Sequence, residues 1–318
     1  MNRRDLLAST AAAIAFAARP SFAIAAAGPE KLRVGYQRTS VLLVVKAQKL
    51  LEKRFAPQSI GIDWFEFPFG PPLLEALGAG ALDYGYTGDA PPIFAQAAHA
   101  PLVYADAIPA RGYGQAIIVP AQSPITDLAG LKGKKIGVAK GSSAHNLLIA
   151  ALESVQLDWK DITPAYLAPA DAAAAFSRGA IDAWSIWDPY LAIAELNAGG
   201  RQLPIDRQTS AQNSFFLANR NFAAKYPEIV HAVNEEIEAA TQWAGTHRDG
   251  LAALYVEASG VSLEAQKRSV DRAEFTAGPL TDKIIAEQQA VADRFYRLGL
   301  IPEKIKVSDI VWNHKAGS

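Results

Sequence analysis

The chain has 318 residues, a formal net charge of −1 and no cysteine, and half of its residues are hydrophobic. A near-neutral balance gives no reason to expect nucleic acid or a membrane surface as a partner, and missing cysteine excludes disulfides, thiolate metal sites and a thiol nucleophile. The only methionine is the initiator, which we interpret as selection on sulfur cost in a protein made when sulfur is scarce, with chance as the alternative.

Residues 1–27 are typical of a secretory signal peptide. A pair of arginines precedes an apolar run over 6–18, and small residues follow up to Ala27. The run is shorter than the roughly 20 residues that a bilayer-spanning helix needs. We expect cleavage after Ala23 or Ala27 and export to the periplasm by a Sec or a twin-arginine route.

Beyond this segment, short strand-like runs alternate with helical ones. Strands are predicted at 32–36, 62–67, 82–87, 135–139 and 181–186, and helices over about 40–54 and from Pro71, Pro91, Ala144 and Pro189. This alternation predicts βαβ units and largely parallel sheets covered by helices. Apolar residues at helical spacing within 222–240 and 284–298 indicate further helices with core-facing stripes.

Two features indicate two lobes. The segment 80–91 is echoed at 179–189, with matching glycines and aspartates, which favours a duplicated α/β lobe over coincidence. The extended segments 113–125 and 213–222 are interpreted as strands that cross between lobes, with ordinary edge strands as the alternative. The expected division is lobe 1 over 28–118, lobe 2 over 119–216, and a return to lobe 1 over 217–318.

The junction "KGSSAHN" (140–146) is the strongest candidate site, because ligands of open α/β sheets bind beyond the carboxyl ends of the strands. Gly141 lets the backbone turn sharply, and Ser142 and Ser143 offer hydroxyl donors. The N–H groups of residues 143–146 would add a helix N-terminus with its dipole. This neutral, donor-rich site suits an oxyanion. The alternative is a plain helix cap with Ser143 at the N-cap.

A catalytic interpretation of the same stretch is disfavoured. The serines and His145 share one turn, in which side chains two positions apart do not face each other, and no third group orients the histidine. The other histidines lack metal-ligand spacing, and no glycine motif for nucleotides follows a strand. We therefore expect no catalysis, no metal and no cofactor.

Three further junction residues are candidates. Asp89 and Asp188 directly precede proline-containing helix starts, where capping is favoured over ligand contact, and both stay among the candidate site residues. Trp187 lies in the second of these junctions, so it could form an aromatic wall for a carbon skeleton. The other aromatic residues near the junctions are more typical of a core.

Several stretches together resemble a known family: "VGYQ", "PADAAAAF", "SFFLA", the long "FEFPFGPPLLEALGAGALDYGYTGDAPPIFAQAA" (65–98), "KGSSAHNLL" (140–148) and "GAIDAWSIWDPY" (179–190). From about Leu32 to Trp312 the chain resembles the periplasmic aliphatic sulfonate-binding proteins of ABC importers. The resemblance implies a type II periplasmic binding fold that closes on its ligand in the cleft between lobes. It also implies a monomer, a permease partner in the inner membrane and a role in sulfur acquisition.

The resemblance also implies a set of contacts. The sulfonate oxygens would meet Gln37, Gly88, Ser142, Ser143, His145 and Asn146, and the carbon chain would lie against Phe69, Trp187 and Phe215. Departures from the family pattern at Ala144 and around Tyr113 predict a rim suited to a different tail. Taurine, an aromatic sulfonate, a sulfate ester or nitrate are alternative ligands. An enzyme related to thiamine-precursor synthases is the alternative of another class, disfavoured by the missing nucleophile.

Overall fold

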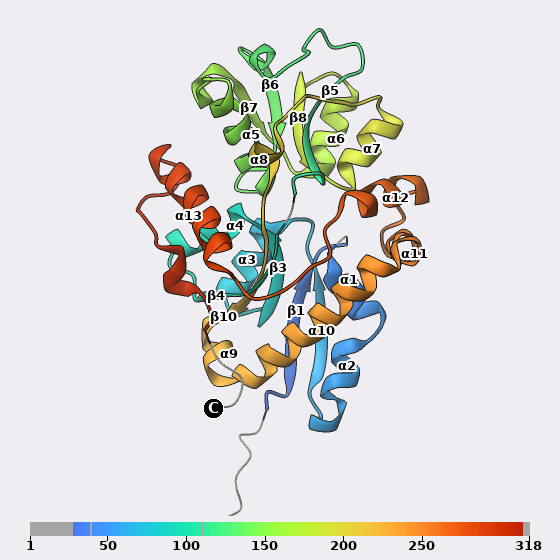
Figure 1. Cartoon of the computed structure of the whole chain (residues 1–318), viewed down its shortest axis with the longest axis vertical. Coiled ribbons are helices and arrows are strands. Elements are labelled where there is room, and N and C mark those ends of the chain that lie inside the picture. Colours follow the sequence, from blue (N-terminus) through green and yellow to red (C-terminus); the bar gives the residue numbers. More distant parts are fainter. Residues whose placement is uncertain (1–27, 39, 110, 314–318) are drawn as a thin grey trace, which may run out of the picture.

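The computed structural model describes residues 28–38, 40–109 and 111–313, so the expected signal peptide lies outside it. Two lobes are stacked along the long axis, each built on one five-stranded sheet (Figure 1). The first sheet has the order β2-β1-β3-β10-β4 and the second β7-β6-β8-β5-β9. The first sheet contains β1 (Lys31–Tyr36), β2 (Gly61–Glu66), β3 (Tyr84–Gly88), β4 (Leu102–Ile108) and β10 (Ser214–Asn219). The second contains β5 (Gln115–Val119), β6 (Lys135–Val138), β7 (Thr163–Tyr166), β8 (Ala183–Trp187) and β9 (Arg201–Gln202).

The two sheets share one topology. In the first, β1 runs parallel to both β2 and β3, and β10 is an antiparallel strand between β3 and β4. In the second, β6 runs parallel to β7 and β8, and β5 is the antiparallel strand between β8 and β9. The predicted α/β fold of two lobes is therefore confirmed.

The echoed aspartates hold the two sheets in the same way. In the first lobe, Asp83 accepts a hydrogen bond from the backbone N–H of Arg33 at 2.8 Å. In the second, Asp182 accepts one from the N–H of Lys135 at 2.7 Å. Each aspartate also donates its own N–H to the carbonyl of the same partner. Equivalent bonds between equivalent parallel strands support the interpretation of a duplicated lobe.

Helices cover both sheets. Lobe 1 carries α1 (Val41–Ala47), α2 (Leu50–Phe55), α3 (Gly70–Gly78) and α4 (Ala90–Ala97), and lobe 2 carries α5 (Ser143–Ser154), α6 (Pro169–Ser177) and α7 (Tyr190–Asn197). The remaining helices are α8 (Arg207–Ser210), α9 (Arg220–Lys225), α10 (Pro227–Thr246), α11 (Arg248–Ser259), α12 (Leu263–Arg272) and α13 (Asp282–Arg297). Proline stands in the first turn of α3 and α4, as predicted, because its missing N–H would have no partner there. The single helix predicted over 40–54 is two helices, since Lys49 adopts a left-handed φ of 54°.

The core of lobe 1 lies on both faces of its sheet, and β10 contributes to each face. Phe216 and Ala218 pack into the apolar cluster under α1, α10 and α11, whereas Phe215 and Leu217 pack into the cluster under α3, α4 and α13. This follows from the alternation of side chains along a strand. The predicted stripes on α10 and α13 are buried in these clusters, so their assignment to core packing is confirmed.

Two crossings join the lobes, one between β4 and β5 and one between β9 and β10. The expected boundaries are displaced by a few residues. Residues 115–118 belong to β5 in the second sheet, and residues 214–216 belong to β10 in the first. Neither strand spans both lobes or forms a sheet edge, because each is inserted antiparallel into the interior of the sheet that it enters. An extended apolar pattern does not reveal which sheet a strand joins.

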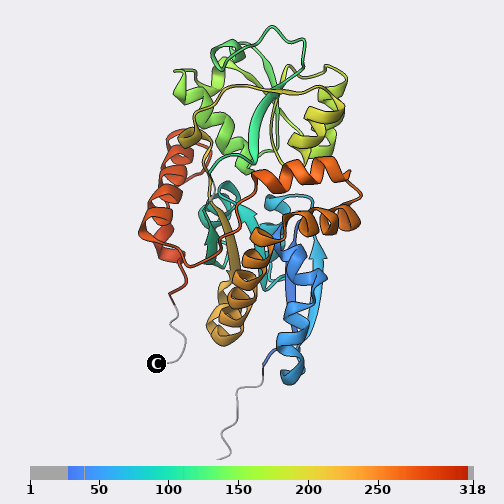
Figure 2. The ribbon, with the colours of Figure 1, turned by 45° about the vertical axis from the view of Figure 1, so that its right-hand side comes forward.

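The return segment brings two helices to the boundary between the lobes. Figures 1 and 2 place α12 directly below α7 of lobe 2, with which it is in contact. Arg294 on α13 binds Glu153 on α5 at 2.9 Å. Among the described residues, no helix is both long and apolar enough to span a membrane.

Candidate functional site

A cleft of about 180 Å³ lies between the lobes, at the carboxyl ends of β1, β3, β6 and β8. This is the position at which parallel α/β sheets bind ligands. Six of the eleven predicted site residues line it: Gln37, Gly88, Ser142, Ser143, Trp187 and Asp188. The other five are not among its lining residues: Phe69, Asp89, His145, Asn146 and Phe215.

The N-terminus of α5 forms the donor-rich wall of the cleft. Gly141 has the left-handed φ of 72° that the sharp turn requires, and the helix begins at Ser143. The hydroxyl of Ser142 donates to the carbonyl of Ala139 at 2.7 Å, and no serine side chain caps the helix. Ser143 is therefore not the capping residue that the alternative interpretation expected.

Fewer backbone donors remain at this helix start than the sequence predicts. The carbonyl of Ser142 accepts from the N–H groups of His145 and Asn146, at 3.0 and 3.3 Å. Within the described part of the chain, the N–H groups of Ser143 and Ala144 and the hydroxyl of Ser143 have no hydrogen-bond partner. With the helix dipole behind them, these donors have the chemistry that an oxyanion requires.

The facing wall comes from the end of β3 in lobe 1. A Cβ at Gly88 would lie 2.9 Å from the Cβ of Ser143, so the two lobes approach closely at this glycine. The hydroxyl of Thr87 is buried and has no partner in the described structure, and the same holds for the amide oxygens of Gln115 and Gln212. Buried polar atoms without partners are rare, and at a cleft they indicate groups that a ligand or water satisfies.

Two arginines and two acidic residues also line the cleft, so their formal charges cancel. Arg272 lies against Asp188 at 3.3 Å, and Arg111 faces Glu274 at 3.7 Å. The junction sequences predict only neutral donors, so neither arginine was expected in the cleft. No local signal marks Arg272, because it lies 84 residues from its partner Asp188.

The two junction aspartates differ in their surroundings. Asp188 accepts the N–H of Ala192 at 3.0 Å in the first turn of α7, and it also lines the cleft. Burial raises its pKa to about 6, and the guanidinium of Arg272 limits the rise. Asp89 accepts the N–H of Ala90 at 2.7 Å, and burial raises its pKa to about 7. Capping, the favoured role, is confirmed at both residues, and only Asp188 faces the cleft.

His145 points away from the cleft, which corrects the expectation that it meets the anion. With 100° per residue, it lies about 200° around α5 from Ser143. Its ring packs on Trp159 and Phe295, at centroid distances of 4.8 and 6.0 Å. Its Nδ1 accepts the N–H of Gly141 at 3.2 Å. Burial lowers its pKa to about 4, so the imidazole is neutral at neutral pH.

Asn146 also lies outside the cleft, because both ends of its amide have other partners. Its Nδ2 donates to Asp89 at 2.5 Å, and its oxygen accepts from Arg294 at 2.7 Å. With these partners it lines a second groove. The expectation that Asn146 contacts the ligand is therefore corrected as well.

Neither predicted phenylalanine lines the cleft. Phe215 is fully buried, with its ring 4.9 Å from that of Tyr104, because strand alternation turns it into the core of lobe 1. Phe69 is the half-buried N-cap residue of α3. The aromatic residues of the cleft are instead Tyr86, Tyr113, Trp187, Tyr255 and Phe275.

Two α/β lobes of one topology, two crossings and a donor-lined cleft between the lobes define a type II periplasmic binding protein fold. The chain belongs to the NMT1-like family, whose model matches residues 25–257.

The chain is similar to several known proteins along most of its length. It is 42% identical over 295 residues to the putative aliphatic sulfonates-binding protein of Escherichia coli K12, covering 92% of each chain. The alkanesulfonate-binding protein SsuA of Xanthomonas axonopodis pv. citri, bound to MOPS, superimposes with a TM-score of 0.86 at 40% identity. The match covers 90% of this chain and 99% of that one. The aliphatic sulphonate-binding SsuA of E. coli gives a TM-score of 0.82 at 42% identity, over 90% and 98% of the chains. The desulfurization enzyme DSZB, at 18% identity and a TM-score of 0.65 over 89% and 96%, shares the fold alone.

Proposed function

We propose that this protein captures aliphatic sulfonates in the periplasm, as a monomer, and delivers them to the inner-membrane permease of an ABC importer. The observation that carries the proposal is the N-terminus of α5 at the cleft. Ser143 lines the cleft, and its hydroxyl, its N–H and the N–H of the following Ala144 have no hydrogen-bond partner among the described residues. A sulfonate is a monoanion with three acceptor oxygens and no proton, so a cluster of donors at a helix N-terminus satisfies it. The names of the similar proteins support the same ligand class.

The aromatic part of the cleft supports an organic tail on the anion. Trp187 stands at the end of β8, next to the donor wall, and Tyr86, Tyr255 and Phe275 complete the aromatic lining. Aromatic side chains bury a large apolar area, and a few placed donors then fix the orientation of the ligand. A ligand with a charged head and an apolar body matches this division.

The charge balance of the cleft favours a monoanion over a dianion. The carboxylates of Asp188 and Glu274 line the same cleft as the donor wall, and each has an arginine beside it. A second negative charge on the ligand would meet these carboxylates and the aromatic surface, at a desolvation cost. Sulfate and phosphate are therefore expected to bind more weakly than a sulfonate.

The position of His145 supports binding without catalysis. Its Nδ1 is engaged with the Gly141 N–H, and its ring lies in an aromatic cluster on the side of α5 away from the cleft. The imidazole therefore does not activate the hydroxyls of Ser142 or Ser143, which a serine nucleophile would require.

Thermal melting of the purified protein against a panel of anions tests the proposal. Ethanesulfonate and hexanesulfonate are expected to raise the melting temperature, since a ligand that binds only the native state stabilises it. The alternative ligands to be compared in the same assay are taurine, benzenesulfonate, a sulfate ester, nitrate and sulfate. A larger shift with nitrate or sulfate than with either alkanesulfonate would contradict the proposal.

A further inference from the structure

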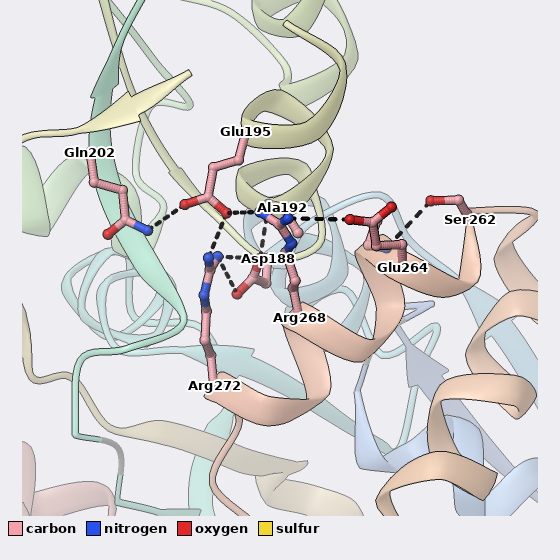
Figure 3. A network of polar contacts seen from close by, with 9 residues as sticks. Asp188, Ala192, Glu195, Gln202, Ser262, Glu264, Arg268 and Arg272 are labelled. Atoms are coloured by element: carbon pink, nitrogen blue, oxygen red, sulfur yellow. Dashed lines mark hydrogen bonds and ion pairs between the residues drawn. The ribbon is translucent and has the colours of Figure 1, made fainter. Parts of the chain in front are cut away.

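An ion network connects the return segment of the chain to lobe 2 beside the cleft (Figure 3). Arg272, at the end of α12, binds Asp188 at 3.3 Å and Glu195 on α7 at 2.5 Å. Both carboxylates belong to lobe 2. The arginine and Asp188 also line the cleft itself, so the network closes part of its boundary.

The network is shielded from solvent and its acidic half is held in place by lobe 2. The side chains of Arg272, Asp188 and Glu195 are 20%, 7% and 14% exposed. Gln202 on β9 donates to Glu195 at 2.6 Å, and Asp188 accepts the N–H of Ala192. Salt screens such a shielded ion pair less than it screens a pair on the surface. Removing one of the two partners leaves the other as a buried charge without compensation, which is costly.

The basic half of the network is tied to lobe 1. Helix α12 packs against α11, which in turn contacts α1. Leu251, Ala252 and Tyr255 of α11 belong to the core cluster of lobe 1. A rotation that separates the lobes on this side would therefore pull Arg272 away from its two carboxylates.

We propose that Arg272 is a positioning residue that latches lobe 1 to lobe 2 beside the cleft and slows the release of bound ligand. The effect on the ligand rests on the proposed function, whereas the effect on the distance between the lobes does not. The latch is defined as Arg272 with Asp188 and Glu195.

A second set of ion pairs between the lobes is not part of the latch. Arg294 and Arg297 on α13 bind Glu153 on α5. Arg294 lines the second groove, and none of these three residues lines the cleft. The latch is therefore defined without these pairs, which do not form the boundary of the cleft.

Arg268 provides a matched control on the same helix. It lies one turn before Arg272, 3.7 Å from Glu195 and 3.2 Å from Glu264, and it neither contacts Asp188 nor lines the cleft. Its side chain is 43% exposed. Arg268→Gln therefore removes one positive charge from α12 and leaves the latch in place.

Lobe opening can be measured without ligand by distances between spin labels. The sequence has no cysteine, so Lys53→Cys on α2 and Ala174→Cys on α6, both exposed, would carry the only two labels. We expect Arg272→Gln to shift the distance distribution to longer values, Arg272→Lys to shift it less, and Arg268→Gln to leave it unchanged. An Arg272→Gln distribution identical to that of the parent would overturn the latch, even if no sulfonate binds.

Stopped-flow tryptophan fluorescence then measures the release of ethanesulfonate. We expect Arg272→Gln to raise the dissociation rate about tenfold without lowering the association rate, because loss of one partner of a shielded charge pair acts mainly on dissociation. Glu195→Gln should also raise the dissociation rate. The variant that carries both Arg272→Gln and Glu195→Gln should release ligand little faster than either single variant. Equal rates for Arg272→Gln and Arg268→Gln would overturn the role in ligand release. Absence of any sulfonate response in the parent protein would count against the proposed function and leave the distance measurement to decide the latch.

Discussion

The two adjacent serines at the start of α5 have different environments. The Ser142 hydroxyl donates to the carbonyl of Ala139 inside the turn, whereas the Ser143 hydroxyl has no partner within the described residues and lines the cleft. Ser143 therefore has a free donor for a ligand. Ser142 uses its hydroxyl proton in a structural bond, so it contributes to the cleft by contact rather than as a donor.

Single replacements should separate these roles. Ser143→Ala is expected to weaken ethanesulfonate binding by about 1.5–3 kcal/mol, the contribution of one hydrogen bond to a charged group, with the melting temperature of the unliganded protein unchanged. Ser142→Ala is expected to lower the free energy of unfolding by about 1 kcal/mol, because the Ala139 carbonyl loses one of its two donors and keeps only the Ser142 N–H. Calorimetric titration and urea unfolding measure the two effects, and the reverse assignment would contradict this account.

Asp106 on β4 gives the protein a pH-dependent stability that is independent of the cleft. One carboxylate oxygen accepts the N–H of Ala107 at 3.0 Å, and the other is buried and has no hydrogen-bond partner among the residues that the structure describes. Burial, and secondarily the charge of Glu238, raises its pKa from 3.8 to about 7. Its contribution to stability is complete below pH 4 and is lost as the pH rises to about 7, because the unfolded chain releases its proton first.

Replacement by asparagine removes this titration. Asp106→Asn should melt at a higher temperature than the parent at pH 8, and the difference should shrink as the pH falls toward 4.5. The difference in the free energy of unfolding between the two proteins should change by about 1.4 kcal/mol per pH unit between pH 4 and 7 and stay constant above that range. A difference in melting temperature that is constant from pH 4.5 to 8 would show that Asp106 does not hold its proton in the folded protein.

The sequence predicted the parts of the site that depend on local geometry. The turn at Gly141, the serines and Trp187 all follow from what comes directly after a strand. His145 and Asn146 lie in the same stretch, yet their side chains point elsewhere, because a helix rotates each residue by 100° and their partners come from other segments. Arg272 could not be predicted, since its place at the cleft depends on the packing of α12 against α7.

The parallel strand pairs β1/β3 and β6/β8 allow the same aspartate interaction to be compared in the two lobes. Asp83 is buried and accepts three hydrogen bonds from Arg33, whereas Asp182 is exposed and accepts one, from the Lys135 N–H. Asp83→Ala should therefore lower the free energy of unfolding by about 3 kcal/mol and Asp182→Ala by about 1 kcal/mol. Equal losses in urea unfolding would mean that the two aspartates hold their sheets with the same strength.

Trp187 is the last residue of β8 and forms part of the aromatic lining of the cleft. The loss of affinity when it is replaced should therefore depend on the length of the ligand's carbon chain. Trp187→Ala is expected to weaken hexanesulfonate more than methanesulfonate, by about 0.8 kcal/mol for each methylene that is no longer buried. The side chain also packs partly against the core of lobe 2, so some loss of stability accompanies the change. Calorimetry with both ligands measures the difference, and equal losses would exclude Trp187 as a wall for the tail.

Most elements could be predicted from their patterns, and the exceptions have physical causes. Apolar runs located β1, β2, β3, β6 and β8, and all but β1 are followed by proline or glycine at the start of the next helix, whereas β4, β7 and β9 were not predicted. The break between α1 and α2 was missed because Lys49 in a left-handed conformation carries no sequence signal. The membership of β5 and β10 in their sheets was missed because it depends on long-range pairing that the extended pattern does not encode.

At the scale of the whole molecule, the duplicated topology places the ends of four parallel strands around one cleft. One lobe contributes the unpartnered Thr87 hydroxyl and the close approach at Gly88, and the other contributes the N-terminus of α5. Neither lobe alone contains the whole donor set. A ligand bound between them would therefore contact both lobes and favour their closed arrangement.

Calorimetric titration of ethanesulfonate and of sulfate into the same protein tests whether this cleft selects an organic sulfonate. Ethanesulfonate is expected to bind with a dissociation constant about tenfold or more below that of sulfate at pH 7.5, since it offers three acceptor oxygens with one charge fewer and an apolar tail. Sulfate binding as tightly as ethanesulfonate would contradict it.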